Sequence, residues 1–158
     1  MEVAGKNTST RTAARPNTAA LSPAARFAGA LALLAVGAVH LQQYEFLYST
    51  IPTIGPLFLL NFVGATVIGL ALLAPVERLL GRLGGLAVGL LALGGAVQAA
   101  AAFVFLLVSE RTPLFGFMEP GYDPTALMAA RVAELVTVGL LGSFLVARLA
   151  GRGSGGRW

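Results

Sequence analysis

The chain of 158 residues contains no cysteine, and only 11% of its residues are charged. The absence of cysteine excludes disulfide bonds, thiolate metal sites and thiol catalysis. An average soluble domain carries roughly 25% charged residues. The mean hydropathy of +0.79 and the 56% of hydrophobic residues therefore indicate an integral membrane protein.

Metal and haem sites lack most of the residues that they need. A metal site needs several convergent ligands, and only His40 and Glu45 are candidates, with Met118 or Met128 as soft partners for copper. A haem held by two imidazoles would need a second copy of the chain, because there is one histidine. No glycine-rich phosphate loop or nucleophile elbow is present. We therefore predict no metal and no cofactor, with quinone or haem as weaker alternatives, and favour a protein that is not an enzyme.

Four apolar runs account for the high hydropathy, at residues 27–41, 54–76, 83–108 and 125–147. The last three each reach the ~20 residues needed to cross a bilayer, and the first does so if its helix continues to Phe46. The sequence predicts an all-α, four-helix membrane bundle, occupying residues 24–149, with spans at about 25–46, 54–76, 83–108 and 125–147.

The basic residues lie almost entirely on one side of these spans. Nine of them precede the first span, connect the second to the third, or follow the fourth; these are Lys6, Arg11, Arg15, Arg26, Arg78, Arg82, Arg148, Arg152 and Arg157. The other two connections contain only Arg111. Because positive loops stay in the cytoplasm, we predict a plasma-membrane protein with both termini cytoplasmic. This distribution accounts for the net charge of +4 without nucleic-acid binding.

Both ends of the chain have the composition of tails. Residues 1–23 are rich in Thr, Ser, Asn, Ala and Pro, which predicts a disordered cytoplasmic tail, and residues 150–158 predict a second flexible one. A cleaved signal peptide competes with a signal anchor for the first span, since Arg26 precedes a short apolar run that reaches Val39.

The two outer connections are rich in aromatic residues. The first holds Tyr44, Glu45 and Tyr48, which we expect at the rim of the bundle. The second, residues 109–123, is apolar for a loop and fits either an aromatic belt at the interface or a lid over the bundle. Asp123-Pro124 is typical of the N-cap and first residue of a helix.

Each predicted span carries a polar side chain in the half nearest these connections. The residues are Arg131, Glu134, His40, Asn61 and Gln98. Polar groups at membrane depth are costly and usually face a bundle interior or a wet cavity. Glu134 follows Arg131 by three positions, so the two can pair along one helix face. The set indicates a ligand pocket, in which Arg131 anchors an anionic or carbonyl group. The alternative is a structural ion pair with interhelical hydrogen bonds around it.

Small residues recur at four-residue spacing, in Gly81-Gly85-Gly89 and again in Gly139-Ser143. This spacing lets helix backbones approach closely in lipid. It fits packing within one bundle or, as the alternative, a homodimer interface.

The segment from Gly37 to Leu72 contains His40-Leu41 and then IPTIGPLFLLN at residues 51–61. It resembles uncharacterised small four-span membrane proteins of high-GC actinobacteria, and this resemblance implies no activity. The layout of the spans is similar to DoxX-like membrane proteins, which implies association with quinone-dependent oxidoreductases.

Three functions fit these features. We favour a binder of a small amphiphilic ligand or of a partner subunit, working through the polar pocket in the outer half of the bilayer. An accessory subunit of a quinone-linked redox complex is the second hypothesis, with His40 and Glu134 moving protons. A proton-coupled small-molecule exporter, acting as a homodimer, is the third. The sequence names neither the ligand nor the larger complex.

Overall fold

A computed structural model describes the backbone of residues 18–154 and the side chains of residues 22–151. Four long helices form the body of the molecule: α1 (Thr18–Phe46), α2 (Ile54–Leu73), α4 (Gly84–Ser109) and α5 (Pro124–Ser154). Three short elements connect them: η1 (Tyr48–Thr50), α3 (Val76–Leu80) and η2 (Gly81–Leu83).

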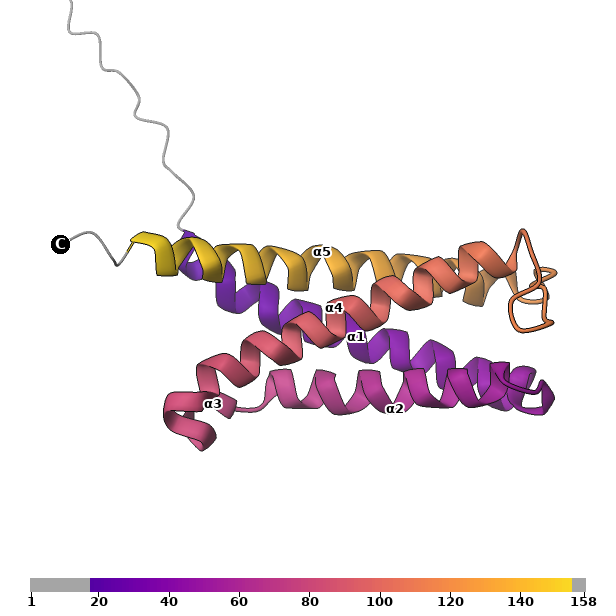
Figure 1. The fold of residues 1–158 in the computed structure, drawn as a ribbon, viewed down its shortest axis with the longest axis horizontal. Helices are drawn as coiled ribbons and strands as arrows, with labels where there is room; N and C mark the ends of the chain where they lie inside the picture. Colours follow the sequence, from indigo (N-terminus) through magenta and orange to yellow (C-terminus); the bar gives the residue numbers. More distant parts are fainter. Residues whose placement is uncertain (1–17, 155–158) are drawn as a thin grey trace, which may run out of the picture.

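The long helices form an antiparallel bundle with α1 packed against both α2 and α5 (Figure 1). At one end, which we call the α3 end, lie α3, the first turns of α1 and the last turns of α5. At the other, which we call the loop end, lie the connections 47–53 and 110–123. Helix α4 lies close to α2 near the α3 end and rises toward α5 at the loop end (Figure 1). Helices α2 and α4 therefore diverge at the loop end.

Four helical segments are long and apolar enough to span a membrane, at Ser22–Phe46, Ile54–Leu73, Val76–Ser109 and Pro124–Gly151. Large apolar side chains such as Val67 and Val146 point outward, whereas small ones such as Ala30 and Ala92 are fully buried. This distribution suits a bundle surrounded by lipid, where small residues allow close helix packing. The predicted all-α, four-span membrane fold is confirmed.

The predicted tails are shorter than expected where the structure describes them. Helix α1 begins at Thr18, so residues 18–23 are helical rather than disordered, and α5 continues to Ser154. The remaining parts of both predicted tails, 1–17 and 155–158, lie outside the described residues.

Glycine allows close packing most clearly at Gly95 of α4. A Cβ there would lie 2.8 Å from Leu33, 3.1 Å from Leu141 and 3.3 Å from Ile68. These three residues belong to α1, α5 and α2, so Gly95 marks the point where all four helices meet. Gly139, by contrast, has open space where its Cβ would lie. Gly139 and Ser143, which share the four-residue spacing, are both exposed on the surface of the bundle.

Arg26 closes the α3 end of the bundle. Its guanidinium donates to the carbonyl oxygens of Leu72 and Ala74, at 2.7 and 2.8 Å, and to Glu77 at 2.6 Å. The last carbonyls of a helix have no partners within that helix, and a cation there also complements the helix dipole. Arg26 is therefore a cap for the end of α2, as well as a basic residue at the end of its own span.

Asp123 begins α5 as the sequence predicted. Its Oδ1 accepts the backbone N–H of Ala126 at 3.0 Å, and Pro124 is the first helical residue. This backbone hydrogen bond, followed by one from Gln43, holds the pKa of Asp123 below its ordinary value. Because Gln43 lies on α1, Asp123 also ties the start of α5 to that helix.

Candidate functional site

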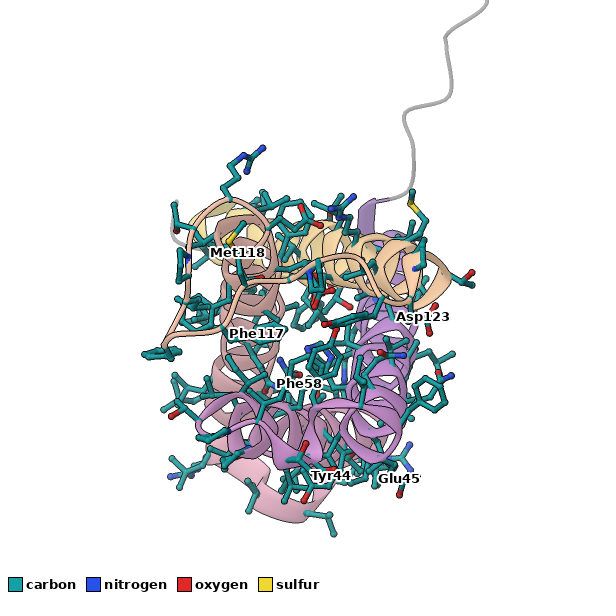
Figure 2. All side chains as sticks on the ribbon, turned by 90° about the vertical axis from the view of Figure 1, so that its right-hand side faces the viewer. Tyr44, Glu45, Phe58, Phe117, Met118 and Asp123 are labelled. Carbon is teal, nitrogen blue, oxygen red and sulfur yellow. The ribbon has the colours of Figure 1, made fainter. Side chains whose placement is uncertain are left out.

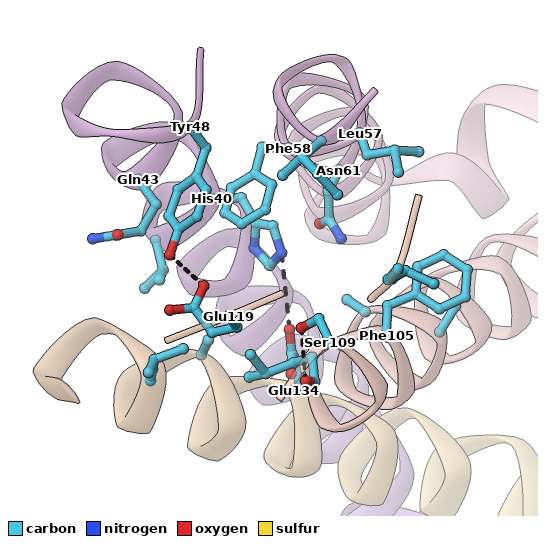
Figure 3. Close-up of a pocket in the computed structure, with 18 of the residues that line it drawn as sticks. His40, Gln43, Tyr48, Leu57, Phe58, Asn61, Phe105, Ser109, Glu119 and Glu134 are labelled. Carbon is cyan, nitrogen blue, oxygen red and sulfur yellow. Dashed lines mark hydrogen bonds and ion pairs between the residues drawn. The ribbon is translucent and has the colours of Figure 1, made fainter. Parts of the chain in front are cut away.

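A cavity of about 310 Å³ lies between the four helices near the loop end (Figure 3). Its wall is largely apolar, and the loop 110–123 contributes Leu114, Phe117 and Glu119. Leu60 of α2 and Phe105 of α4 line the cavity while remaining 66% and 44% exposed. The cavity therefore opens sideways between α2 and α4, toward the lipid-facing surface. Its size falls at the lower limit of small-molecule pockets.

Glu134 is the most deeply buried carboxyl group in the cavity wall, with 1% of its side chain exposed. Its Oε1 lies 3.9 Å from Nε2 of His40, and no described residue donates a hydrogen bond to its Oε2 (Figure 3). A buried polar atom without a partner costs ~1–3 kcal/mol. Because Glu134 belongs to the cavity wall, a small shift of its side chain would present this acceptor to a ligand.

The tautomer of His40 follows from its other ring nitrogen. Nδ1 lies 2.9 Å from the carbonyl oxygen of Val36. A carbonyl only accepts hydrogen bonds, so Nδ1 carries the hydrogen and the neutral ring turns the Nε2 lone pair toward Glu134. Two acceptors face each other unless one of them holds a proton. His40 and Glu134 can therefore exchange one proton between them.

Gln98 and Asn61 connect α4 to α2 beside the cavity. The Gln98 amide donates to the backbone carbonyl of Asn61 at 2.8 Å and to its side-chain oxygen at 3.1 Å. Gly64 leaves room for this contact, because a Cβ there would lie 2.8 Å from the Gln98 side chain. Both predicted residues line the cavity, and their hydrogen bonds join the two helices between which it opens.

An aromatic cluster forms the loop end of the cavity. Tyr48 stacks on Phe58 with ring centroids 4.6 Å apart and meets the edge of Phe117 at 5.6 Å. Its hydroxyl donates to Glu119 at 2.5 Å. Burial, followed by this hydrogen bond, raises the pKa of Tyr48 above its ordinary value. In Figure 2, Phe58 and Phe117 point toward the centre of the bundle.

The loop 110–123 has features of both predicted alternatives. Leu114, Phe117 and Glu119 cover the cavity, as a lid would. Phe115 and Tyr122 are exposed, as in an aromatic belt. The same loop therefore closes one end of the cavity and presents apolar surface outward.

The predicted pairing of Arg131 with Glu134 along α5 is wrong. The Arg131 guanidinium instead donates to Glu110, at the end of α4. Arg131 does not line the cavity, although its charge still acts on Glu134. The expected anchoring of an anionic group by Arg131 therefore loses its geometric basis, because a side chain of a neighbouring helix end already holds that cation.

Of the three residues predicted at the rim, the structure places Tyr48 in the cavity wall and Tyr44 and Glu45 outside it. The latter two lie at the outer edge of the bundle in Figure 2, away from Phe58, and neither lines the cavity. The first outer turn places Tyr48 inward through η1, whereas Tyr44 and Glu45 still belong to α1 and follow its outer face.

Gln43, Ser109 and Glu119 also line the cavity, and sequence analysis did not include them in the site. Gln43 lies three residues after His40, so helical spacing alone places the two on one face. Ser109 and Glu119 belong to the second outer connection or its border, and nothing in their spacing predicts the folded loop that brings them inward.

Among the described residues, no group of three or more His, Asp and Glu side chains is arranged to hold a metal ion. No protein-family model matches the chain, and no curated protein or solved structure matches it significantly. The residues of the cavity are therefore the basis for assigning a function.

Proposed function

We propose that this protein binds a small amphiphilic molecule in the cavity between its four helices. The observation that carries the proposal is the buried Glu134 carboxyl, which belongs to the wall of an apolar cavity and whose Oε2 has no donor among the described residues. An apolar wall with few convergent polar groups is the usual chemistry of a small-molecule site. The ligand's apolar part would occupy the wall formed by α2 and α4, and its polar group would reach Glu134.

The sideways opening supports a ligand that dissolves in the membrane. Exposed Leu60 and Phe105 flank the opening, and both lie within segments that can span the bilayer. A molecule in the lipid phase would reach the cavity between α2 and α4 without crossing the loop 110–123. An ordinary water-soluble metabolite would need that loop to open.

The proposal is tested by mass spectrometry of organic extracts from the wild type and from Ala102→Phe, purified identically in mild detergent. Ala102 lines the cavity, so a phenyl ring there would fill the space. Val104→Phe is the matched control, because Val104 is exposed on the same helix and does not line the cavity. We expect a species that is retained by the wild type and the control and lost from Ala102→Phe. Identical extracts from three folded proteins would contradict the proposal.

We further propose that the α3 end faces the cytoplasm of a plasma membrane and that the cavity lies in the outer half. The charge distribution supports this orientation, because Arg26, Arg78, Arg82 and Arg148 gather at the α3 end. The absence of cysteine allows single-cysteine labelling without background. In intact cells, a membrane-impermeant maleimide should label Ser49→Cys but not Leu79→Cys. The opposite labelling pattern would reverse the orientation.

Proton-coupled export is a second candidate, and the His40–Glu134 geometry favours it. A carboxyl and an imidazole that share one proton at a ligand cavity can couple ligand release to proton uptake. In proteoliposomes, a pH gradient should then drive loss of the extracted species, and Glu134→Gln should abolish this transport while the protein stays folded. Binding without gradient-driven transport would contradict the export function and leave the binding function in place.

A further inference from the structure

The charged groups of the cavity are all acidic. Glu134 and Glu119 line it, and none of the described Lys and Arg residues belongs to its wall. The nearest cation on α5, Arg131, is held by Glu110, so the two charges compensate each other. Within the part of the chain that the structure describes, Glu134 forms no ion pair with a Lys or Arg side chain, and its ionic neighbour is His40 at 3.9 Å.

The loop end as a whole carries an excess of negative charge. Its acidic residues are Glu45, Glu110, Glu119, Asp123 and Glu134, whereas its basic residues are Arg111 and Arg131. Arg111 is exposed and donates to the carbonyl oxygen of Leu107. A surface with an excess of one charge raises the local concentration of ligands of the opposite charge. Cations are therefore favoured at this end of the molecule.

The aromatic residues of the cavity fit the same ligand class. The ring of Phe58 lies 5.1 Å from that of His40, which in turn faces Glu134. Tyr48 and Phe117 complete the aromatic border of the cavity, and Tyr48 contacts its second carboxyl group, Glu119. Aromatic rings attract organic cations through their negative faces, and a desolvated carboxylate needs a positive charge nearby.

We propose that the ligand is a lipophilic organic cation, either a protonated amine or a quaternary ammonium with an apolar body. This inference rests on the proposed function, because it assigns a chemical class to the ligand of the same cavity. The ammonium group would lie against Glu134 and the aromatic border, and the apolar body would extend toward the opening between α2 and α4. Neutral alcohols and amides can also donate to Glu134, but they bring no positive charge that could replace the proton shared with His40.

The test compares benzyltrimethylammonium with neopentylbenzene, its neutral isostere, by equilibrium dialysis in detergent. Binding to Ala102→Phe is subtracted from each value, which removes partition into micelles. We expect the cation to bind the wild type at least tenfold more tightly than the isostere. Glu134→Gln should lose at least tenfold in affinity for the cation, whereas Glu45→Gln, at an exposed acidic position outside the cavity, should retain it.

The dependence on pH provides a second measurement on the unmodified protein. As pH falls, protons compete with the cation for Glu134, and protonation of His40 on α1 adds a positive charge beside it. On α5, Arg131 is paired with Glu110 outside the cavity, while the polar side chains that α2 and α4 present to the cavity are Asn61, Gln98 and Ser109. From the loop end, Tyr48 and Glu119 face the cavity. The affinity for benzyltrimethylammonium should therefore decrease as the pH is lowered. An affinity independent of pH would overturn the inference.

The possible outcomes distinguish failure of the cation inference from failure of the proposed binding function. Equal binding of both probes, or tighter binding of the isostere, would overturn the cation inference and leave the binding function intact. The same holds if neither probe binds while the wild type still retains an extracted species that Ala102→Phe loses. If neither probes nor extracts distinguish the wild type from Ala102→Phe, the inference and the proposed function fall together.

Discussion

The hydroxyl of Tyr48 donates to Glu119, 71 positions later in the chain, and so joins the two loops that close one end of the bundle. Glu119 Oε1 also accepts the backbone N–H of Gly121, and its own N–H donates to Ser109 at 2.9 Å. The loop 110–123 is thus folded around one buried carboxylate. Because Tyr48 also stacks on Phe58, the aromatic border of the cavity and the fold of the loop depend on the same side chain.

Tyr48→Phe should destabilise the loop without removing the aromatic stacking. The substitution deletes the hydroxyl and leaves one oxygen of buried Glu119 without its donor, which costs ~1–3 kcal/mol. We expect a lower thermal midpoint in detergent and faster limited proteolysis within residues 110–123. Tyr44→Phe is the control, because Tyr44 lies on the outer face of α1. Equal effects of the two substitutions would contradict the role of Tyr48.

The raised pKa of Tyr48 makes the same contact sensitive to alkali. The folded protein favours the protonated phenol, so its contribution is fully present below the ordinary pKa of 10.0 and is lost as pH rises above it. The wild type should lose thermal stability above pH 10 more steeply than Tyr48→Phe, which has no phenol to ionise at this position. Parallel curves for the two proteins would show that this ionisation has no effect on stability.

Gly95→Ala should be destabilising and Gly94→Ala should not. A methyl group at Gly95 would lie 2.8 Å from Leu33 and 3.1 Å from Leu141, whereas at Gly94 its nearest neighbour is Ile68 at 3.7 Å. Overpacking costs typically ~1–3 kcal/mol, while replacing a helical glycine with alanine gains up to ~1 kcal/mol. Unfolding of both variants in mixed micelles measures the difference. A Gly95→Ala protein as stable as Gly94→Ala would mean that the centre of the bundle can expand.

Arg26→Met should destabilise the α3 end more than Glu77→Gln does. Removing Arg26 leaves the carbonyl of Leu72 without its donor and takes one of two donors from the carbonyl of Ala74, which also accepts the N–H of Val76. Removing the charge of half-exposed Glu77 weakens only one of the three contacts of Arg26. Hydrogen bonds to charged groups contribute ~1.5–3 kcal/mol each. Hydrogen exchange at the end of α2 and the midpoint of unfolding should both respond to Arg26→Met. If Glu77→Gln has the larger effect, the ion pair matters more than the cap.

The sequence could predict the fold because hydrophobicity along the chain determines which segments enter a membrane. The spans ending at Phe46 and beginning at Ile54 and Pro124 agree with the expected limits to within a residue or so. It could also predict that His40, Asn61, Gln98 and Glu134 would meet, because each is a polar residue at similar depth on its helix.

Partners of the charged side chains could not be predicted in the same way. The spacing of Arg131 and Glu134 puts both on one face of α5, but a long side chain can also turn to a partner on another helix, so the spacing allowed a contact without requiring it. Glu110 was assigned to a loop, yet the end of α4 brings it to Arg131. Glu119 enters the cavity only because its loop folds back on Ser109, and no helical or strand period describes such a segment.

A double-mutant cycle on α5 should find Arg131 coupled to Glu110 rather than directly to Glu134. Arg131 and Glu110 are 32% and 25% exposed at their side chains, so the contact is intermediate between surface and buried pairs. Arg131→Met or Glu110→Gln alone should cost about 1–3 kcal/mol, and the double variant should cost less than their sum, because neither charge is then left without its partner. When Arg131→Met is combined with Glu134→Gln, the changes in the free energy of unfolding should be closer to additive, because no hydrogen bond joins those side chains. The measurement is unfolding in mixed micelles for all six proteins, with the wild type as reference. A larger coupling to Glu134 than to Glu110 would restore the pairing along one helix face, and would return Arg131 to the cavity as a possible anchor for an anion.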